Sequence, residues 1–163
     1  MNSIKTMIIN ELKVITDISE YSYDIISYTF DHIKENNHEA KYALIKIFKH
    51  PKKDNIIKDS ILYCYNDYNK LFENVYLHTD DLFVFTDMIR SIVIILSEKY
   101  EINKKSILVL VEILFKCLFY ILQDKTNNSF IFHSLLNSAV KSCEFDFSSI
   151  YDYKDNNCFS CCC

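Results

Sequence analysis

Glycine is absent from this chain of 163 residues, which also has one proline and no tryptophan. At the usual share of about 7%, a protein of this length would have about eleven glycines. Hairpin turns and tight connections between strands depend on glycine, so a fold that uses many of them is disfavoured. An all-α protein is the expected fold class.

An excess of basic charge is also missing, because 18 basic residues are interspersed with 22 acidic ones, for a net charge of -4. Such a chain offers no basic field for phosphates, so nucleic acid is not expected as a partner. The N-terminus has no continuous apolar segment and no small-residue cleavage site, and a cytosolic protein is therefore expected. Cys64, Cys117 and Cys143 occur singly in helical patterns and are predicted to be buried, reduced thiols.

Catalytic motifs are missing as well. The sequence has no phosphate-binding loop, nucleophile elbow, HExxH motif or EF-hand loop, so we expect neither an enzyme nor a cofactor. The five histidines are far apart in sequence and are expected to be ordinary surface residues. The terminal C-x-x-C-C-C is a weak zinc-ligand set without a second cysteine pair, so no metal is expected.

Half of the residues are hydrophobic, including 12 Tyr and 12 Phe, which indicates a chain that folds around one core. Its organising element is predicted to be a helix over residues 79–100. Thr79 is the expected N-cap, and Asp80 and Asp81 would lie in the first turn, near the positive end of the helix dipole. Residues 92–96 are all apolar, so this helix is predicted to lie in the centre of the core.

A second apolar helix is predicted over residues 104–123, capped by Asn103 and antiparallel to the first. Residues 92–96 and 107–122 are predicted to be largely inaccessible to solvent. A membrane-spanning interpretation is disfavoured because the apolar run is shorter than the roughly 20 residues needed, and Glu112 and Lys116 interrupt it.

The other helices are predicted from apolar residues at helical spacing over residues 4–15, 22–33, 40–48, 54–75 and 132–140. The third of these must stop near His50, because Pro51 follows. The fourth is either one helix or two with a break near Asn69. From Glu144 the pattern dissolves, so the predicted organisation is a helical domain over residues 1–143 and a disordered, cysteine-ending tail over residues 144–163.

This order of elements, about seven helices with a buried central helical hairpin, resembles the Bcl-2 fold. Asp87-Met88-Ile89-Arg90 stands where the family carries Asn-Trp-Gly-Arg, and Arg90 is the only arginine of the chain. Gln123-Asp124 and the aromatic start Phe130-Ile131-Phe132 are similar to a second family pattern. The opening SIKTMIINELKVITDISE is similar to the start of poxviral members, so the resemblance is to the poxvirus Bcl-2-like family, over roughly residues 1 to 143.

The resemblance implies a viral inhibitor of host apoptosis that sequesters pro-apoptotic Bcl-2 family proteins through their BH3 helices. The family's signature arginine pairs with a BH3 aspartate, and the guanidinium of Arg90 is suited to hold a carboxylate bidentately. The alternative is that Arg90 pairs with Asp87 or Asp81 on its own helix. Ile89 replaces the family's glycine, which would exclude some BH3 ligands.

The candidate peptide groove combines apolar and aromatic positions of the second to fifth predicted helices with the signature residues. They are Phe30, Leu44, Ile47, Phe48, Tyr65, Tyr68, Phe72, Phe85, Asp87, Met88 and Arg90. For each of the apolar ones, core packing is an equally good interpretation.

Two other function classes stay open. Some poxviral Bcl-2-like proteins bind signalling adaptors through outer helix faces and inhibit NF-κB or innate immune signalling. A non-enzymatic helical assembly protein is the third possibility. The sole arginine at the signature position favours apoptosis inhibition, whereas the missing hydrophobic C-terminal anchor favours the signalling inhibitor.

The tail offers a replacement for that anchor. Clustered cysteines at a mobile terminus are accessible to acylation, and two acyl chains suffice for stable membrane attachment. The candidate lipidation sites are Cys158, Cys161, Cys162 and Cys163. Lipidation would bring the protein from the host cytoplasm to the mitochondrial outer membrane or another intracellular membrane; an unmodified tail is the alternative. The resemblance is compatible with a monomer or a homodimer.

Overall fold

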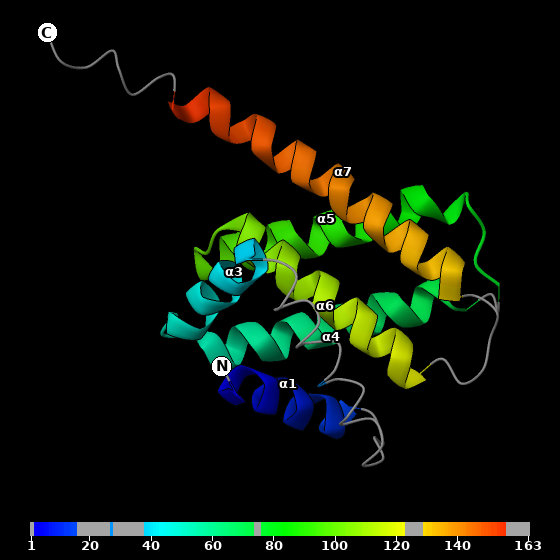
Figure 1. The fold of residues 1–163 in the computed structure, drawn as a ribbon, viewed down its shortest axis with the longest axis horizontal. Helices are drawn as coiled ribbons and strands as arrows, with labels where there is room; N and C mark the ends of the chain where they lie inside the picture. The colour runs from blue at the N-terminus through cyan, green and yellow to red at the C-terminus, as the bar shows by residue number, and fades with distance from the viewer. Residues whose placement is uncertain (1, 16–26, 28–37, 74–75, 123–128, 156–163) are drawn as a thin grey trace, which may run out of the picture.

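The computed structural model describes residues 2–15, 27, 38–73, 76–122 and 129–155. Within these ranges the chain is all-helical and has no strand, which confirms the predicted all-α class (Figure 1). The helices are α1 (Asn2–Ile15), α3 (His38–Lys49), α4 (Lys53–Leu71), α5 (Asp81–Tyr100), α6 (Lys104–Leu122) and α7 (Ser129–Asp155). The helix predicted over residues 22–33, with the groove candidate Phe30, falls almost entirely outside the described residues.

The central helix of the structure is α6, whereas residues 79–100 were predicted to hold this place. Helix α6 contacts α3, α4, α5 and α7 and contributes eleven buried residues, from Ser106 to Phe119. Helix α5 packs against α4, α6 and α7, but Ile95 is 43% exposed and Ile94 is only partly buried. The predicted inaccessibility of residues 92–96 is therefore confirmed for Ile92, Val93 and Leu96 and wrong for Ile95. The neighbours of α5 leave one of its faces at the surface.

The connection between α5 and α6 shows how a chain without glycine makes a tight turn. Glu101 adopts the left-handed conformation, with φ 54° and ψ 40°, and has the only positive φ among the described residues. The N–H of Ile102 donates to the carbonyl of Ser97 at 3.0 Å, which closes the end of α5. The side-chain Oδ1 of Asn103 accepts a hydrogen bond from the N–H of Lys105 at 2.7 Å, which confirms the predicted cap.

Other helix ends differ from the predictions in part. Helix α3 ends at Lys49, just before Pro51, as predicted, and α4 continues past Asn69 without a break. The predicted Thr79 cap of α5 is wrong, because the residue preceding the helix is Asp80, whose side chain makes no capping bond. Instead, Oδ2 of Asp81 accepts a hydrogen bond from the N–H of His78 at 2.7 Å.

The last helix is longer than predicted. The sequence pattern placed its end near residue 143, but α7 continues to Asp155, so the segment from Glu144 onward begins as helix. Phe147 is only 6% exposed and extends the buried stripe of Leu136, Val140 and Cys143 by one more turn. Helix α7 packs against α5, and in Figure 1 its C-terminal end extends beyond the other helices. Residues 156–163, with the four candidate lipidation cysteines, lie outside the described residues.

The core contains a cluster of aromatic rings that joins four helices. The rings of Phe119 and Phe132 are stacked, with centroids 4.3 Å apart and an interplanar angle of 9°. The ring of Phe132 also lies 5.7 Å from that of Phe85 and 6.0 Å from that of Phe72. This cluster therefore fixes the start of α7 against α4, α5 and α6, because aromatic pairs add to the gain from apolar burial.

The three described cysteines are buried and free, as predicted. Burial raises the pKa of Cys117 to about 12 and that of Cys143 to about 11. Both thiols are thus protonated at neutral pH and act as small apolar groups in the core.

Candidate functional site

The sole arginine of the chain lies where α5 meets α7. Two nitrogens of the Arg90 guanidinium, Nη2 and Nε, donate to Oδ2 of Asp146 at 2.6 Å and 3.2 Å. Nη1 donates to Oδ1 of Asp87, one turn earlier on α5, at 2.7 Å. The expected alternative of a pair with Asp87 is thus confirmed, and a second carboxylate, which the sequence analysis missed, comes from α7.

Both ion pairs are accessible to solvent. The side chain of Arg90 is 35% exposed, that of Asp146 is 42% exposed and that of Asp87 is 74% exposed. The hydrogen bond to Asp146 raises the pKa of Arg90, so the guanidinium stays charged at every accessible pH. Ion pairs this exposed are worth little, because water and salt screen the charges. A competing carboxylate could therefore replace either aspartate at small cost.

Arg90 lines a shallow surface pocket of about 470 Å³, which we call the Arg90 pocket. It is lined by Arg90, Ser138, Lys141, Ser142, Phe145 and Asp146. All but Arg90 lie on α7, and the side chain of Phe145 is 76% exposed. Arginine and aromatic side chains are the residue types most enriched at protein interfaces. The pocket therefore combines a charged group with an apolar anchor.

Most of the apolar groove candidates lie in the core. Leu44, Ile47 and Phe85 are 0% exposed and Tyr68 is 3% exposed, so core packing is the interpretation that holds for these four. Phe48, Tyr65 and Phe72 are partly buried against the same core, and Met88 is partly buried on α5. None of these eight lines the Arg90 pocket. Of the candidates in the described part of the chain, Asp87 is the one that forms a hydrogen bond with Arg90.

The residues that the sequence analysis missed all lie on α7. Asp146 and Phe145 follow the predicted end of the last helix, in the segment that was expected to be a disordered tail. The one signal that would have found them is the recurrence of apolar residues through Phe147, which places Asp146 on the edge of the buried stripe of α7.

A second polar contact joins α4 to the end of α5. Oδ2 of Asp59 accepts hydrogen bonds from Nζ of Lys99 at 2.6 Å and from the hydroxyl of Tyr100 at 2.5 Å. Partial burial raises the pKa of Asp59, but the two donors outweigh burial and the net pKa lies below the usual 3.8. Burial and the hydrogen bond to Asp59 raise the pKa of Tyr100. This group fits a structural clamp between helices.

His133 departs from the predicted surface location. Its ring lies edge-on to that of Phe119, at 5.5 Å, and equally close to that of Tyr120. Burial, together with the charge of Lys116, lowers the pKa of His133 below its usual 6.5. Lys116 itself pairs with Glu112 at 2.6 Å along α6. The imidazole is therefore neutral at pH 7 and packs as an aromatic ring.

The described part of the chain holds no cluster of three or more His, Cys, Asp or Glu side chains that could bind a metal ion. None of the helices in that part is both long and apolar enough to cross a membrane. Comparison with known proteins finds no family model, no curated protein and no solved structure that matches this chain. The Bcl-2-like resemblance thus rests on the residues quoted above.

Proposed function

We propose that this protein is a non-enzymatic binding domain that holds a helical segment of a partner protein at the Arg90 pocket. The observation that carries the proposal is the position of the only guanidinium of the chain beside the exposed ring of Phe145 in an open depression. A carboxylate of the partner would take two hydrogen bonds from Arg90, and an apolar side chain would cover Phe145.

We further propose that the domain is Bcl-2-like and that the partner segment is the BH3 helix of a host pro-apoptotic protein, which would make it a viral inhibitor of apoptosis. The support is the place of Arg90 on α5, in the stretch 87–90 that resembles the family signature. The ligand aspartate would replace Asp146 or Asp87 on the guanidinium. Because both ion pairs are exposed to solvent, breaking either one costs little free energy.

A second candidate is inhibition of NF-κB or innate immune signalling through helix surfaces. The observation that favours it is the burial of Leu44, Ile47, Tyr68 and Phe85, since buried side chains cannot line an open groove. At the start of α5, Phe83 is 78% exposed and Val84 is 50% exposed, and neither lines the Arg90 pocket. Exposed apolar residues of this kind would suit contact with another protein.

The test is calorimetric titration of the protein with a panel of BH3 peptides. Binding by the parent protein that is weakened by Arg90→Ala but unchanged by Lys49→Ala supports the proposal. Lys49 is an exposed cation on α3, outside the Arg90 pocket, and so controls for net charge. Failure of the parent to bind any peptide would contradict the BH3 assignment. A host partner whose binding is lost in Phe83→Asp and kept in Arg90→Ala would support the second candidate.

A further inference from the structure

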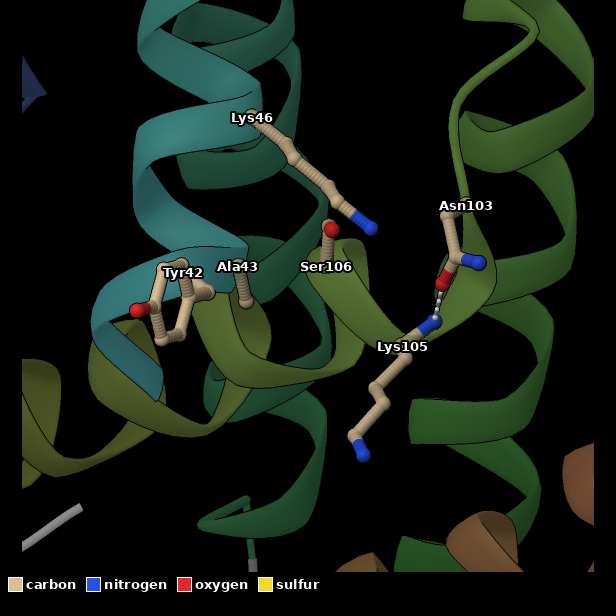
Figure 2. Close-up of a pocket in the computed structure, with 6 residues that line it drawn as sticks. All are labelled: Tyr42, Ala43, Lys46, Asn103, Lys105 and Ser106. Atoms are coloured by element: carbon tan, nitrogen blue, oxygen red, sulfur yellow. Dashed lines mark hydrogen bonds between the residues drawn. The ribbon is translucent and has the colours of Figure 1, made fainter. Parts of the chain in front are cut away.

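A small pocket of about 190 Å³ lies between α3 and the first turn of α6. It is lined by Tyr42, Ala43, Lys46, Asn103, Lys105 and Ser106 (Figure 2). Figure 2 shows Nζ of Lys46 and Oγ of Ser106 entering the same gap from the two helices, with Asn103 across from them. A single water needs only about 10–15 Å³ of such space, so the pocket has room for a polyatomic ion.

Ser106 is the unusual residue of this pocket. Four serine or threonine side chains are buried in the described part of the chain, namely Ser60, Thr86, Ser97 and Ser106. The first three donate their hydroxyls to a carbonyl of the preceding helical turn, at 2.5 Å, 2.7 Å and 3.0 Å. Ser106 is 2% exposed, but within the described ranges its hydroxyl makes no bond of this kind, and it faces the pocket instead (Figure 2).

The position of Ser106 in α6 explains this difference. It lies in the first turn, so the residue four positions earlier, Ile102, precedes the helix and cannot present a helical carbonyl. The backbone N–H of Ser106 donates to the carbonyl of Asn103 at 3.0 Å, so the hydroxyl is the donor of Ser106 that faces the pocket. The hydroxyl is therefore free to donate a hydrogen bond to a group that enters the pocket.

The surroundings of that hydroxyl are positively charged. Lys46 makes no ion pair within the described ranges, and none of the six lining residues is acidic. Lys105 adds a second cation, although Figure 2 shows its side chain extending away from Lys46. The positive end of the α6 dipole points to the same place and favours an anion there.

We propose that this pocket binds a phosphate-type oxyanion, either free phosphate or the phosphate group of a soluble ester. Nζ of Lys46 and the hydroxyl of Ser106 would donate hydrogen bonds to it, and Lys105 and the helix dipole would add attraction at longer range. The side chain of Asn103 would continue to cap α6 when the ligand is bound, because its Oδ1 already accepts a hydrogen bond from the N–H of Lys105. The site is separate from the Arg90 pocket and does not depend on the proposed function.

The experiment is an NMR titration of the ¹⁵N-labelled full chain with inorganic phosphate, and in parallel with glycerol 3-phosphate, at constant ionic strength set by chloride. Saturable shifts of the backbone amides of residues 103–107 are expected. Lys46→Gln should weaken binding by about tenfold, the effect of one charge-assisted hydrogen bond. Lys41→Gln removes the same charge from the same helix, outside the pocket, and should leave the affinity unchanged.

Ser106→Ala supplies an independent readout. It should weaken binding by several-fold without lowering the melting temperature of the ligand-free protein, because the hydroxyl faces the pocket and makes no bond to the preceding helical turn. Shifts with both ligands would identify the phosphate group itself as the ligand, and shifts with glycerol 3-phosphate alone would identify an ester. Non-saturable shifts, or equal effects of Lys46→Gln and Lys41→Gln, would overturn the proposal.

Discussion

Arg90 of α5 and Asp146 of α7 are 56 positions apart in sequence and form an ion pair of 2.6 Å, with a second hydrogen bond of 3.2 Å from Nε. The pair fastens the second half of α7 to α5. The carboxylate of Asp146 thus binds the guanidinium of Arg90, which was expected to bind a carboxylate of the ligand. Because both side chains are more than one third exposed, the pair contributes only about 0.2–1 kcal/mol to folding.

The first prediction separates ligand binding from folding at this pair. Arg90→Ala should weaken BH3-peptide binding by about 1.5–3 kcal/mol, the range for a hydrogen bond to a charged group. It should lower the free energy of unfolding by at most about 1 kcal/mol. Calorimetry and urea denaturation measure the two quantities.

Asp146→Asn is the complementary change. It removes the competing negative charge and should strengthen peptide binding, whereas Glu144→Gln, an exposed change of equal charge on α7 outside the pocket, should not. An affinity that falls in Asp146→Asn would show that the α7 carboxylate supports the ligand and does not compete with it.

The second prediction concerns two phenylalanines at the start of α7. Phe132 is fully buried in the aromatic cluster, so Phe132→Ala should lower the free energy of unfolding by about 3–5 kcal/mol. Phe130 is 84% exposed, and Phe130→Ala should change it by less than about 0.5 kcal/mol. Equal effects of the two substitutions in urea denaturation would contradict the observed packing of α7.

The third prediction tests the clamp formed by Asp59 and Tyr100. A double-mutant cycle of Asp59→Asn and Tyr100→Phe should give a coupling free energy of about 1.5–3 kcal/mol at pH 7, since the hydrogen bond has a charged acceptor. The folded-state pKa of Asp59 is lowered, so its contribution is present above its usual 3.8 and is lost as the pH falls through the lowered value. A coupling that stays constant into that acidic range would contradict this assignment.

The fourth prediction is a pH dependence caused by His133. Its pKa is lowered in the folded state, so the unfolded chain binds the proton more readily below pH 6.5. The parent protein should therefore lose stability between pH 7.5 and pH 5.5 relative to His133→Phe, in thermal melts at both pH values. His78→Phe is the control, because His78 is exposed. A difference between parent and His133→Phe that does not change with pH would exclude the effect.

The fifth prediction concerns the four terminal cysteines. If lipidation anchors the protein, the chain purified from host cells should exceed its sequence mass by whole lipid groups and sediment with membranes. A variant with Cys158, Cys161, Cys162 and Cys163 changed to serine should have its sequence mass and remain in the soluble fraction. Intact-mass measurement and fractionation decide the point, and a parent that has its sequence mass is unmodified.

The sequence by itself determined the features that depend on neighbouring residues. The absence of glycine predicted an all-α chain, Pro51 predicted the end of α3, and Asn103 predicted the cap of α6. Pro51 acts through its fixed φ angle and Asn103 through a hydrogen bond to the backbone, and both effects reach only about one helical turn. The burial of Cys64, Cys117 and Cys143 followed equally from apolar residues at helical spacing.

Only the tertiary structure decided which helix lies at the centre, where α7 ends and which partner Arg90 takes. An apolar run shows that a segment prefers to leave water, but it does not show which neighbours cover it, and α6 holds the place predicted for α5. In the same way, core residues and groove residues have the same apolar pattern, so Phe85 was a candidate for both. The pairing of Arg90 with Asp146 exists because the continued stripe of α7 packs on α5 and brings together two charges that are remote in the chain.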